Sequence, residues 1–311
     1  MKRFAPVAVF TYSRPIHTKN TLEALDKCHD ADETDLFIFC DNYKNEQSKN
    51  MVLQVRTIVE NYAKISSYKN VTIYKSEYNK GLAMSIREGV TKIISQYGNV
   101  IVIEDDLIVS KNLLIYMNKA LDIYKYNNKI WSISGYSFEM KSLNDYPHDI
   151  YTSGRACSWG WATWKDRWNK IDWHIESYDK FKFNIKKRYY FSRWGKDLSP
   201  MLDYQVLQGI NSWAIIWCFQ GFLEDMYTIY PKKSLIKNVG ADGTGEHQST
   251  ANKKFYTQLD DRDNFDISFE ILDPDESIRK EFSKRYSSGW YIDMKVYIKD
   301  LFLRIGFNIK K

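Results

Sequence analysis

The chain has 311 residues with 44% hydrophobic and 27% charged side chains, a composition typical of an ordinary globular protein that buries a large core in one elaborated domain or two. Its formal net charge of +6 is mild and spread along the sequence. Such a charge fits an anionic ligand or an anionic membrane surface and argues against a dedicated nucleic-acid binder, so no nucleic-acid partner is expected.

Aromatic residues make up 16% of the chain, including 10 Trp and 23 Tyr. Aromatic faces stack on sugars and on bases, although most such residues fill protein cores. The four cysteines have no metal-ligand spacing, and nothing in their pattern indicates an oxidising compartment. The apolar stretch near the N-terminus is too short for a signal peptide, and no segment is long enough to span a bilayer. We therefore expect a cytoplasmic protein.

The first hundred residues alternate short apolar runs with longer amphipathic segments. Strands are expected at residues 7–10, 36–40, 71–74 and 100–103, and helices at 16–28, 51–65 and 82–96. Strands and helices that alternate at this spacing form βαβ units around a parallel sheet. The pattern predicts an α/β fold with a Rossmann-like, mostly parallel sheet flanked by helices.

The fourth of these strands ends on three consecutive carboxylates, Glu104, Asp105 and Asp106. Three adjacent like charges at the end of a buried strand cost free energy unless a cation meets them. Ligands of open α/β sheets bind at the carboxyl ends of the strands, so a hard divalent cation that itself holds a pyrophosphate is the natural partner. Alternatively the acids cap the next helix, although Ser110 already offers an N-cap.

Other polar residues follow the neighbouring strands and should converge on the same crevice. Arg14 and Lys80 are candidates to contact phosphates, and Asp41 is a candidate to accept a hydrogen bond from a base or a ribose. Each residue taken alone is also explained by ordinary loop polarity. No phosphate-cradling glycine loop follows the first strand, so the chain has neither a dinucleotide fingerprint nor a P-loop.

The loop Thr11-Tyr-Ser-Arg-Pro15, Asp41 and the segment Val-Ile-Glu-Asp-Asp-Leu107 together resemble the motifs of GT-A glycosyltransferases. More narrowly they resemble the mannosyl-glycoprotein N-acetylglucosaminyltransferase family and related bacterial sugar transferases, over roughly residues 5 to 250. The resemblance implies that Asp106 binds Mn²⁺ or Mg²⁺ and that Glu104 and Asp105 face the ribose. It also implies that Thr11, Arg14, Asp41 and Lys80 belong to the nucleotide-sugar site.

Beyond residue 129, after another expected strand, the sequence becomes rich in tryptophan. Trp161, Trp164 and Trp168 recur at helical spacing, which predicts a helix that packs an aromatic stripe into the core. Alternatively part of this cluster, Trp159 and Trp161 beside Gly160, floors an acceptor-sugar site.

The resembled family carries its catalytic aspartate near Asn211 and Ser212, and neither of these residues can act as a general base. The nearest carboxylates that could replace it are Asp203, slightly upstream, and Asp242, in a glycine-rich loop. His247, at the end of that loop, resembles a family histidine that approaches the metal or the donor phosphates. It is equally explained as a surface histidine.

The chain divides into three expected parts. Residues 1–128 form a nucleotide-sugar-binding half, residues 129–250 form the acceptor-binding and catalytic half of the same domain, and residues 251–311 form a peripheral extension. The tail from 290 to 311 interleaves apolar and basic residues. This pattern suits an amphipathic segment on an anionic membrane, and equally a terminal helix docked on the protein.

Together these features predict a metal-dependent glycosyltransferase that moves a sugar, with N-acetylglucosamine as one candidate, from a UDP-sugar to a glycan or a lipid-linked saccharide. Inversion at the anomeric carbon and a role in surface polysaccharide biosynthesis follow from the resemblance alone. The first alternative is a sugar-1-phosphate nucleotidyltransferase, which the missing glycine loop disfavours. The second is a catalytically inactive carbohydrate-binding protein of the same fold, which Asn211 keeps open.

Overall fold

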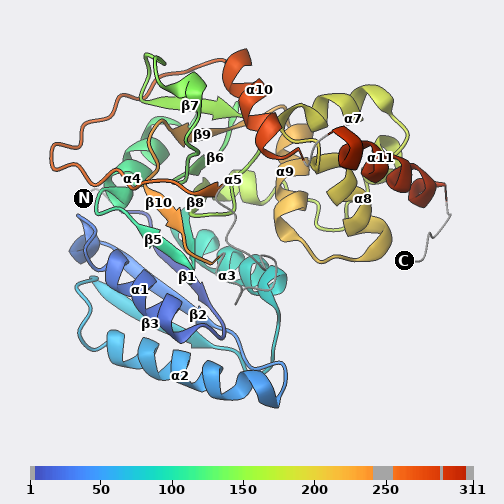
Figure 1. Ribbon diagram of the computed structural model, residues 1–311. Coiled ribbons are helices and arrows are strands. Elements are labelled where there is room, and N and C mark those ends of the chain that lie inside the picture. The colour runs from blue at the N-terminus through green and yellow to red at the C-terminus, as the bar shows by residue number, and fades with distance from the viewer. Residues whose placement is uncertain (1–3, 241–254, 288–289, 306–311) are drawn as a thin grey trace.

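The computed structural model describes residues 4–240, 255–287 and 290–305. Its centre is one eight-stranded sheet with the strand order β3-β2-β1-β4-β8-β6-β9-β7 (Figure 1). The strands are β3 (Asn70–Lys75), β2 (Asp35–Cys40), β1 (Val7–Thr11), β4 (Asn99–Glu104), β8 (Trp161–Trp164), β6 (Ile130–Ser134), β9 (Tyr227–Pro231) and β7 (Ile150–Ser153). Only β8 and β7 run antiparallel to their neighbours, so the predicted α/β fold with a mostly parallel sheet is confirmed.

The first half of the sheet has the expected βαβ construction. Its helices are α1 (Pro15–Leu25), α2 (Glu46–Tyr62), α3 (Leu82–Tyr97) and α4 (Leu113–Ile123), with a short 3₁₀ turn η1 (Ala31–Glu33). The strand order reverses between β1 and β4, and crossovers in such sheets are right-handed. This places α1 and α2 on one face, where they contact each other, and α3 on the opposite face against β1 and β4.

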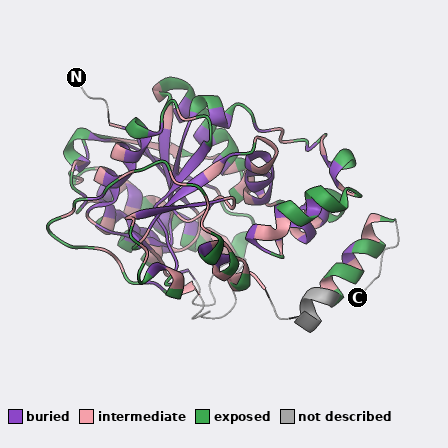
Figure 2. Ribbon diagram, turned by 90° about the horizontal axis from the view of Figure 1, so that it is seen from above, coloured by how far each residue is buried: buried purple, intermediate pink, exposed green. Residues whose placement is uncertain are grey.

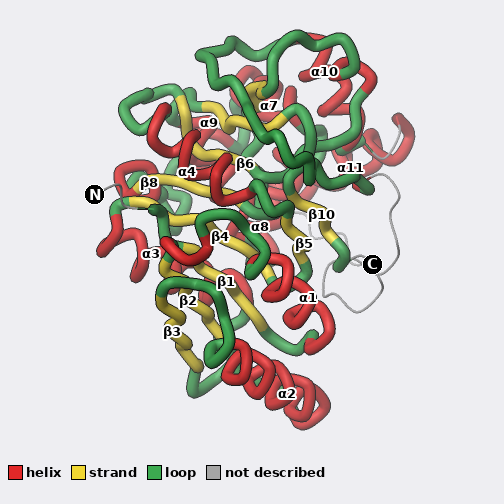
Figure 3. The backbone as a smooth tube through the Cα atoms, turned by 90° about the vertical axis from the view of Figure 1, so that its left-hand side faces the viewer, coloured by secondary structure: helices red, strands yellow, loops and turns green. Residues whose placement is uncertain are grey.

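The second half carries more and shorter helices. They are α5 (Lys165–Trp168), α6 (Tyr178–Phe181), α7 (Ile185–Phe191), α8 (Leu198–Gln208), α9 (Trp213–Leu223), α10 (Glu276–Arg285) and α11 (Trp290–Arg304), with 3₁₀ turns η2 (Lys141–Leu143) and η3 (Ser192–Trp194). A separate two-stranded sheet pairs β5 (Leu107–Val109) with β10 (Ile236–Asn238), and Figure 3 shows both strands near α1.

The tryptophan cluster lies in the core, but the predicted helix is wrong. Trp161 and Trp164 are the first and last residues of strand β8, and only Trp168 is helical, in α5. All four residues of β8 are buried, so both faces of this strand are covered and no two-residue alternation marks it in the sequence. Trp161 is fully buried against Trp213 and Trp217, with ring centroids 5.3 Å away in each case.

Burial follows the sheet closely. The strands of the sheet centre are buried, and exposed residues gather on the outer helices and on the last helix, α11 (Figure 2). α11 packs against α8, as expected for a docked terminal helix. In the described part of the chain, no helix is long and apolar enough to cross a membrane.

Candidate active site at the carboxyl ends of β1 and β4

The loop after β1 and the acidic run after β4 meet where the strand order reverses, which is the ligand-binding position of open α/β sheets. Arg14 connects them, because its Nη2 lies 3.1 Å from Asp105 Oδ1 and 2.8 Å from Asp106 Oδ2. Burial would lower the pKa of Arg14, but the two carboxylates outweigh it and raise that pKa. The guanidinium of Arg14 therefore forms ion pairs with two of the three acids, Asp105 and Asp106.

Asp105 lies at the N-terminal end of α1, which begins with Pro15 directly after Arg14. Its Oδ2 accepts hydrogen bonds from the Tyr12 backbone N–H at 3.1 Å and from Thr18 Oγ1 at 3.4 Å. Burial raises the pKa of Asp105, Arg14 counteracts that effect, and Asp106 adds to it. Asp105 thus anchors the β1 loop to β4, a role that the sequence analysis did not anticipate.

Glu104 ends β4 and is half-buried. Burial raises the pKa of Glu104 well above its ordinary value, and the charges of Asp106 and Asp105 raise it further. Three neighbouring acids in one crevice cannot all ionise cheaply, so Glu104 keeps its proton more readily than a surface glutamate does.

Asp106 has spare binding capacity. Its Oδ1 is buried and has no hydrogen-bond partner, and the same is true of Arg14 Nη1. The backbone carbonyl of Asp106 accepts a hydrogen bond from Val239 N at 2.9 Å. The next residue, Gly240, packs so closely that an added Cβ would lie 2.0 Å from Asp106 Oδ2.

These features decide how a metal would fit. Within the residues that the structure describes, no three His, Cys, Asp or Glu side chains gather into a metal-binding cluster. A cation held by one carboxylate, with its other ligands from a diphosphate and water, needs no such cluster, and Mg²⁺ is commonly bound in this way. The unpartnered Asp106 Oδ1 suits that mode, so the residues present fit a cation that arrives with its substrate.

Asp41 is not available to a base or a ribose. Its Oδ1 accepts hydrogen bonds from the backbone N–H groups of Asn42 at 2.8 Å and Lys80 at 2.9 Å. Its Oδ2 accepts from Gly81 N at 2.9 Å and from Asn79 Nδ2 at 3.2 Å. A carboxylate offers about four acceptor sites, so Asp41 is saturated and instead holds the β3–α3 loop against the end of β2.

Lys80 and Thr11 also have partners. The Lys80 ammonium lies 2.6 Å from Glu88 Oε2 on α3, and Thr11 is buried with its hydroxyl 3.4 Å from the Phe39 carbonyl. Both residues lie at the predicted strand ends. A phosphate would have to compete with Glu88 for Lys80.

A cavity of about 190 Å³ is lined by residues of the second half of the chain and by Phe255 and Tyr286. Gly160, which follows the cavity-lining Trp159, lies against the strand that ends in the acids, because an added Cβ there would meet Ile236 and, at 3.4 Å, Ile103 of β4. Half-buried Trp159, the residue before Gly160, lines the cavity and packs edge-on against Tyr136 and Phe255. The lining is mainly apolar: Arg155, Ala156, Cys157, Ser158, Trp159, Leu198, Met201, Ala214, Ile215, Cys218, Phe255 and Tyr286.

The acceptor-site hypothesis therefore stays a prediction for Trp159 and is wrong for Trp161. Trp159 lines this cavity, whereas Trp161 has no exposed surface and cannot contact a sugar without unpacking the core.

Asp203 does not fit the role of general base. It is fully buried, and Arg188 binds both of its oxygens at 2.9 and 2.6 Å while Tyr178 donates to Oδ1 at 2.7 Å. A carboxylate held in this way cannot reach a bound hydroxyl. The other candidate base, Asp242, and the predicted metal contact His247 lie outside the described residues.

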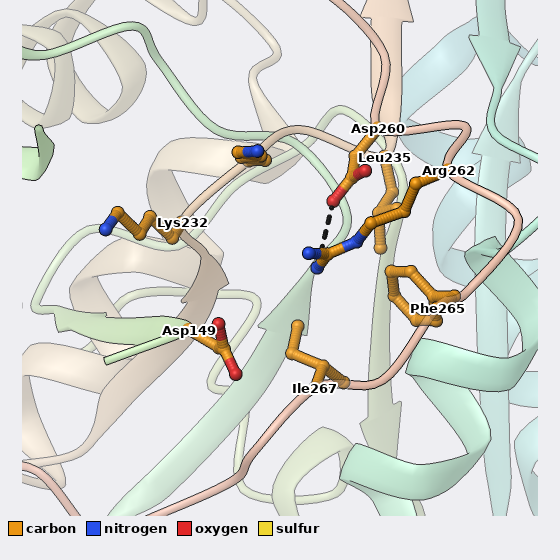
Figure 4. Close-up of a pocket in the computed structure, with 8 residues that line it drawn as sticks. Asp149, Lys232, Leu235, Asp260, Arg262, Phe265 and Ile267 are labelled. Carbon is orange, nitrogen blue, oxygen red and sulfur yellow. Dashed lines mark ion pairs between the residues drawn. The ribbon is translucent and has the colours of Figure 1, made fainter. Parts of the chain in front are cut away.

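A second cavity, of about 200 Å³, contains none of the predicted site residues. Figure 4 shows Asp149, Lys232, Asp260 and Arg262 around it, with the Asp260–Arg262 ion pair at 3.3 Å. Lys232 donates to the Tyr146 carbonyl at 2.5 Å. Two of the cations that line this cavity therefore already have partners, and Lys233 lines it as well.

Some contributors to the site carry no sequence motif. Thr21 donates to the Asp105 carbonyl at 2.9 Å, and His17 lies 3.2 Å from the Val239 carbonyl. With Thr18 they form a polar stripe on α1 at spacings of one, three and four residues. Polar residues on the buried side of a helix whose other side is exposed are the signal that could have revealed Thr18 and Thr21.

No protein-family model and no curated protein matches the chain. Among solved structures it is similar to S. aureus TarS, with 16% identity and a TM-score of 0.33 over 42% of this chain and 21% of that one. It is also similar to the mannosyltransferase PcManGT from Pyrobaculum calidifontis in complex with GDP-Man and Mn²⁺, with 12% identity and a TM-score of 0.38 over 53% of this chain and 46% of that one.

A third similar structure is the galactosyltransferase LgtC in complex with donor and acceptor sugar analogs, with 8% identity and a TM-score of 0.32 over 54% of this chain and 60% of that one. The chain thus spans less than two thirds of each of the three proteins. The last two are glycosyltransferases by name. At such low scores, these similarities by themselves assign neither a donor nor an acceptor.

Proposed function

We propose that this protein is a glycosyltransferase that uses the crevice between β1 and β4 to bind a nucleotide sugar. The observation that carries the proposal is the pair of buried atoms without partners, Asp106 Oδ1 and Arg14 Nη1, at the carboxyl ends of the central strands. A buried oxygen and a buried guanidinium N–H without partners favour a ligand that brings a cation and an anion together. A metal-bound diphosphate has both charges.

In the proposed division of labour, residues 1–128 hold the donor and residues 129–250 hold the acceptor. Arg14 binds a diphosphate oxygen through Nη1, and Asp105 keeps the Arg14 side chain in place. Asp41 fixes the loop that presents Lys80. When bound, Mn²⁺ or Mg²⁺ would be held by Asp106 and would offset the negative charge of the leaving diphosphate.

Trp159 and the cavity beside it receive the acceptor. A sugar presents an apolar face that packs on an aromatic ring, and a mainly apolar cavity close to the donor orients one hydroxyl toward it. We further propose a UDP-sugar donor, a glycan or lipid-linked saccharide acceptor and inversion at the anomeric carbon, all of which rest on the sequence resemblance. Asp242 remains the proposed general base.

One observation favours a second candidate, a carbohydrate-binding protein of the same fold that does not catalyse transfer. None of the described residues that line the Trp159 cavity carries a carboxylate, and Asp203 is locked in an ion pair. Without a base, a sugar hydroxyl is a poor nucleophile at neutral pH. A donor-consumption assay separates the two candidates.

The decisive experiment replaces Asp106 by Asn, with the exposed Asp32→Asn on η1 as the matched control. Transfer or hydrolysis of a radiolabelled UDP-sugar with Mn²⁺ should fall on the order of 10²–10³-fold in Asp106→Asn and stay unchanged in the control. The Mn²⁺-dependent rise in melting temperature caused by UDP should disappear as well. Full activity of Asp106→Asn would overturn the assignment.

A further inference from the structure

Helix α11 has an unusual distribution of polar and apolar residues. The side that faces the protein carries buried charges next to half-buried Val296 and Leu303: Asp300 is fully buried, and the side chain of Arg304 is 5% exposed. Arg188 of α7 joins Asp300 at 2.8 Å and Asp203 of α8 at 2.6 Å, and Arg304 donates to the Lys182 carbonyl at 2.7 Å. Ion pairs and hydrogen bonds therefore fix which side of α11 faces inward.

The outward side is apolar. With about 100° per residue, the five exposed apolar residues of α11 and its end fall within an arc of about 140° that begins next to Asp300 and extends away from it. We call this set the α11 apolar face; it consists of Tyr297, Ile298, Leu301, Phe302 and Ile305, which are 40–57% exposed. A surface helix normally buries its apolar residues and exposes its charges, whereas α11 exposes these five apolar residues and buries the charges of Asp300 and Arg304.

Basic residues border this face. On the same helical projection, Lys295 and Lys299 follow Phe302 at the edge of the arc. The segment that includes α7 and α8 is also basic, since residues 180–210 contain seven Lys and Arg and two Asp, although α8, which packs against α11, has no Lys or Arg. Phe183 and Ile185, close in sequence to Lys182, whose carbonyl accepts from Arg304, are exposed apolar residues as well.

We propose that the α11 apolar face docks on an anionic phospholipid membrane. An apolar arc bordered by lysines is the pattern of helices that lie in the membrane interface, with the ring and aliphatic side chains among the acyl chains and the ammonium groups at the phosphates. A symmetric contact with a second copy would bring the same basic borders together, which like-charge repulsion disfavours. The ion pairs on the inward side hold α11 with its apolar face outward, so that this face can contact lipid while the helix stays folded.

The experiment uses the full-length protein and sedimentation with vesicles of phosphatidylcholine, either alone or mixed with phosphatidylglycerol. We expect binding to the mixed vesicles that weakens as salt is added. Ile298→Asn with Phe302→Asn removes apolar contact, and Lys295→Gln with Lys299→Gln removes charge. Each pair should weaken the partition by about ten-fold or more.

The matched control is Ile123→Asn with Tyr126→Asn, which removes two exposed apolar side chains at the end of α4 and should leave vesicle binding unchanged. Sedimentation equilibrium of the same variants tests whether a second copy of the protein binds to the α11 apolar face instead. Absence of vesicle binding, equal binding to both vesicle types, or binding that neither variant pair weakens would overturn the proposal. A dimer that the apolar variants dissociate, without lipid binding, would assign the face to a second copy instead. None of these readouts depends on sugar transfer.

Discussion

At the scale of single residues, the candidate site depends on a close approach that only glycine permits. Gly240 lies against Asp106 and Arg14, and an added Cβ would be 2.0 Å from Asp106 Oδ2 and 2.9 Å from Arg14 Nη1. Both distances are too short for a carbon atom. One of the two side chains that carry the proposed function would have to move.

Gly240→Ala is therefore expected to lower kcat/KM for transfer on the order of 10²-fold, because a displacement of about 1 Å in a catalytic group costs roughly that factor. The fold should be retained, since the sheet is untouched, and far-UV circular dichroism checks this. Asn238→Ala, which removes only the acceptor of the Gly240 N–H, is the milder comparison. Normal turnover of Gly240→Ala would mean that the Asp106–Arg14 arrangement does not support catalysis.

At the scale of elements, the buried ion pairs couple α11 to α7 and α8. Burial raises the pKa of Asp300 to about 7, and its hydrogen bond to Asp203 and the charge of Asp203 act in the same direction. A group with a folded-state pKa above its unfolded value stabilises the fold fully at low pH, and that contribution is lost as the pH rises through the folded value. The attachment of α11 should thus weaken between about pH 4 and pH 7.

Amide hydrogen exchange in α11, corrected for intrinsic rates, should show greater protection at pH 5 than at pH 8 in the wild-type protein. Asp300→Asn should remove most of this difference, because the amide does not titrate. Asp179→Asn, an exposed partner of Lys182, should keep it. An unchanged pH profile in Asp300→Asn would show that another group controls the attachment of the helix.

At the scale of the whole molecule, the two halves of the chain, residues 1–128 and 129–250, share one sheet, because β4 of the first half pairs with β8 of the second. All 10 Trp lie beyond residue 130, so Trp fluorescence reports only the second half. Ile38→Ala in the centre of β2 removes a fully buried side chain from the tryptophan-free half and should cost about 2–5 kcal/mol.

If the two halves unfold as one unit, this substitution shifts the urea midpoint of Trp fluorescence and that of far-UV circular dichroism equally. The exposed Ile65→Ala should shift neither. If Ile38→Ala leaves the urea midpoint of Trp fluorescence unchanged, the two halves unfold independently in spite of the shared sheet.

Much of the first half was predictable because its information is local. The apolar runs of β1, β2 and β4 and the periodicity of α2 and α3 are properties of neighbouring residues, and they placed Arg14, Asp41, Lys80 and the acids at the strand ends. In the second half, β8 is covered on both faces, so it lost the alternation that marks a strand. Its tryptophans fell by chance at helical spacing.

What the sequence by itself determined is therefore the α/β plan and the edge of the sheet that carries the polar residues. Only the tertiary structure decided which charges are free. Asp41 is saturated by a loop 40 residues away, Asp203 is paired with Arg188 and close to Asp300 of the last helix, and Asp106 retains an oxygen without a partner. The physical reason is that hydrophobic periodicity is read along the chain, whereas the availability of a carboxylate depends on partners that folding brings from distant segments.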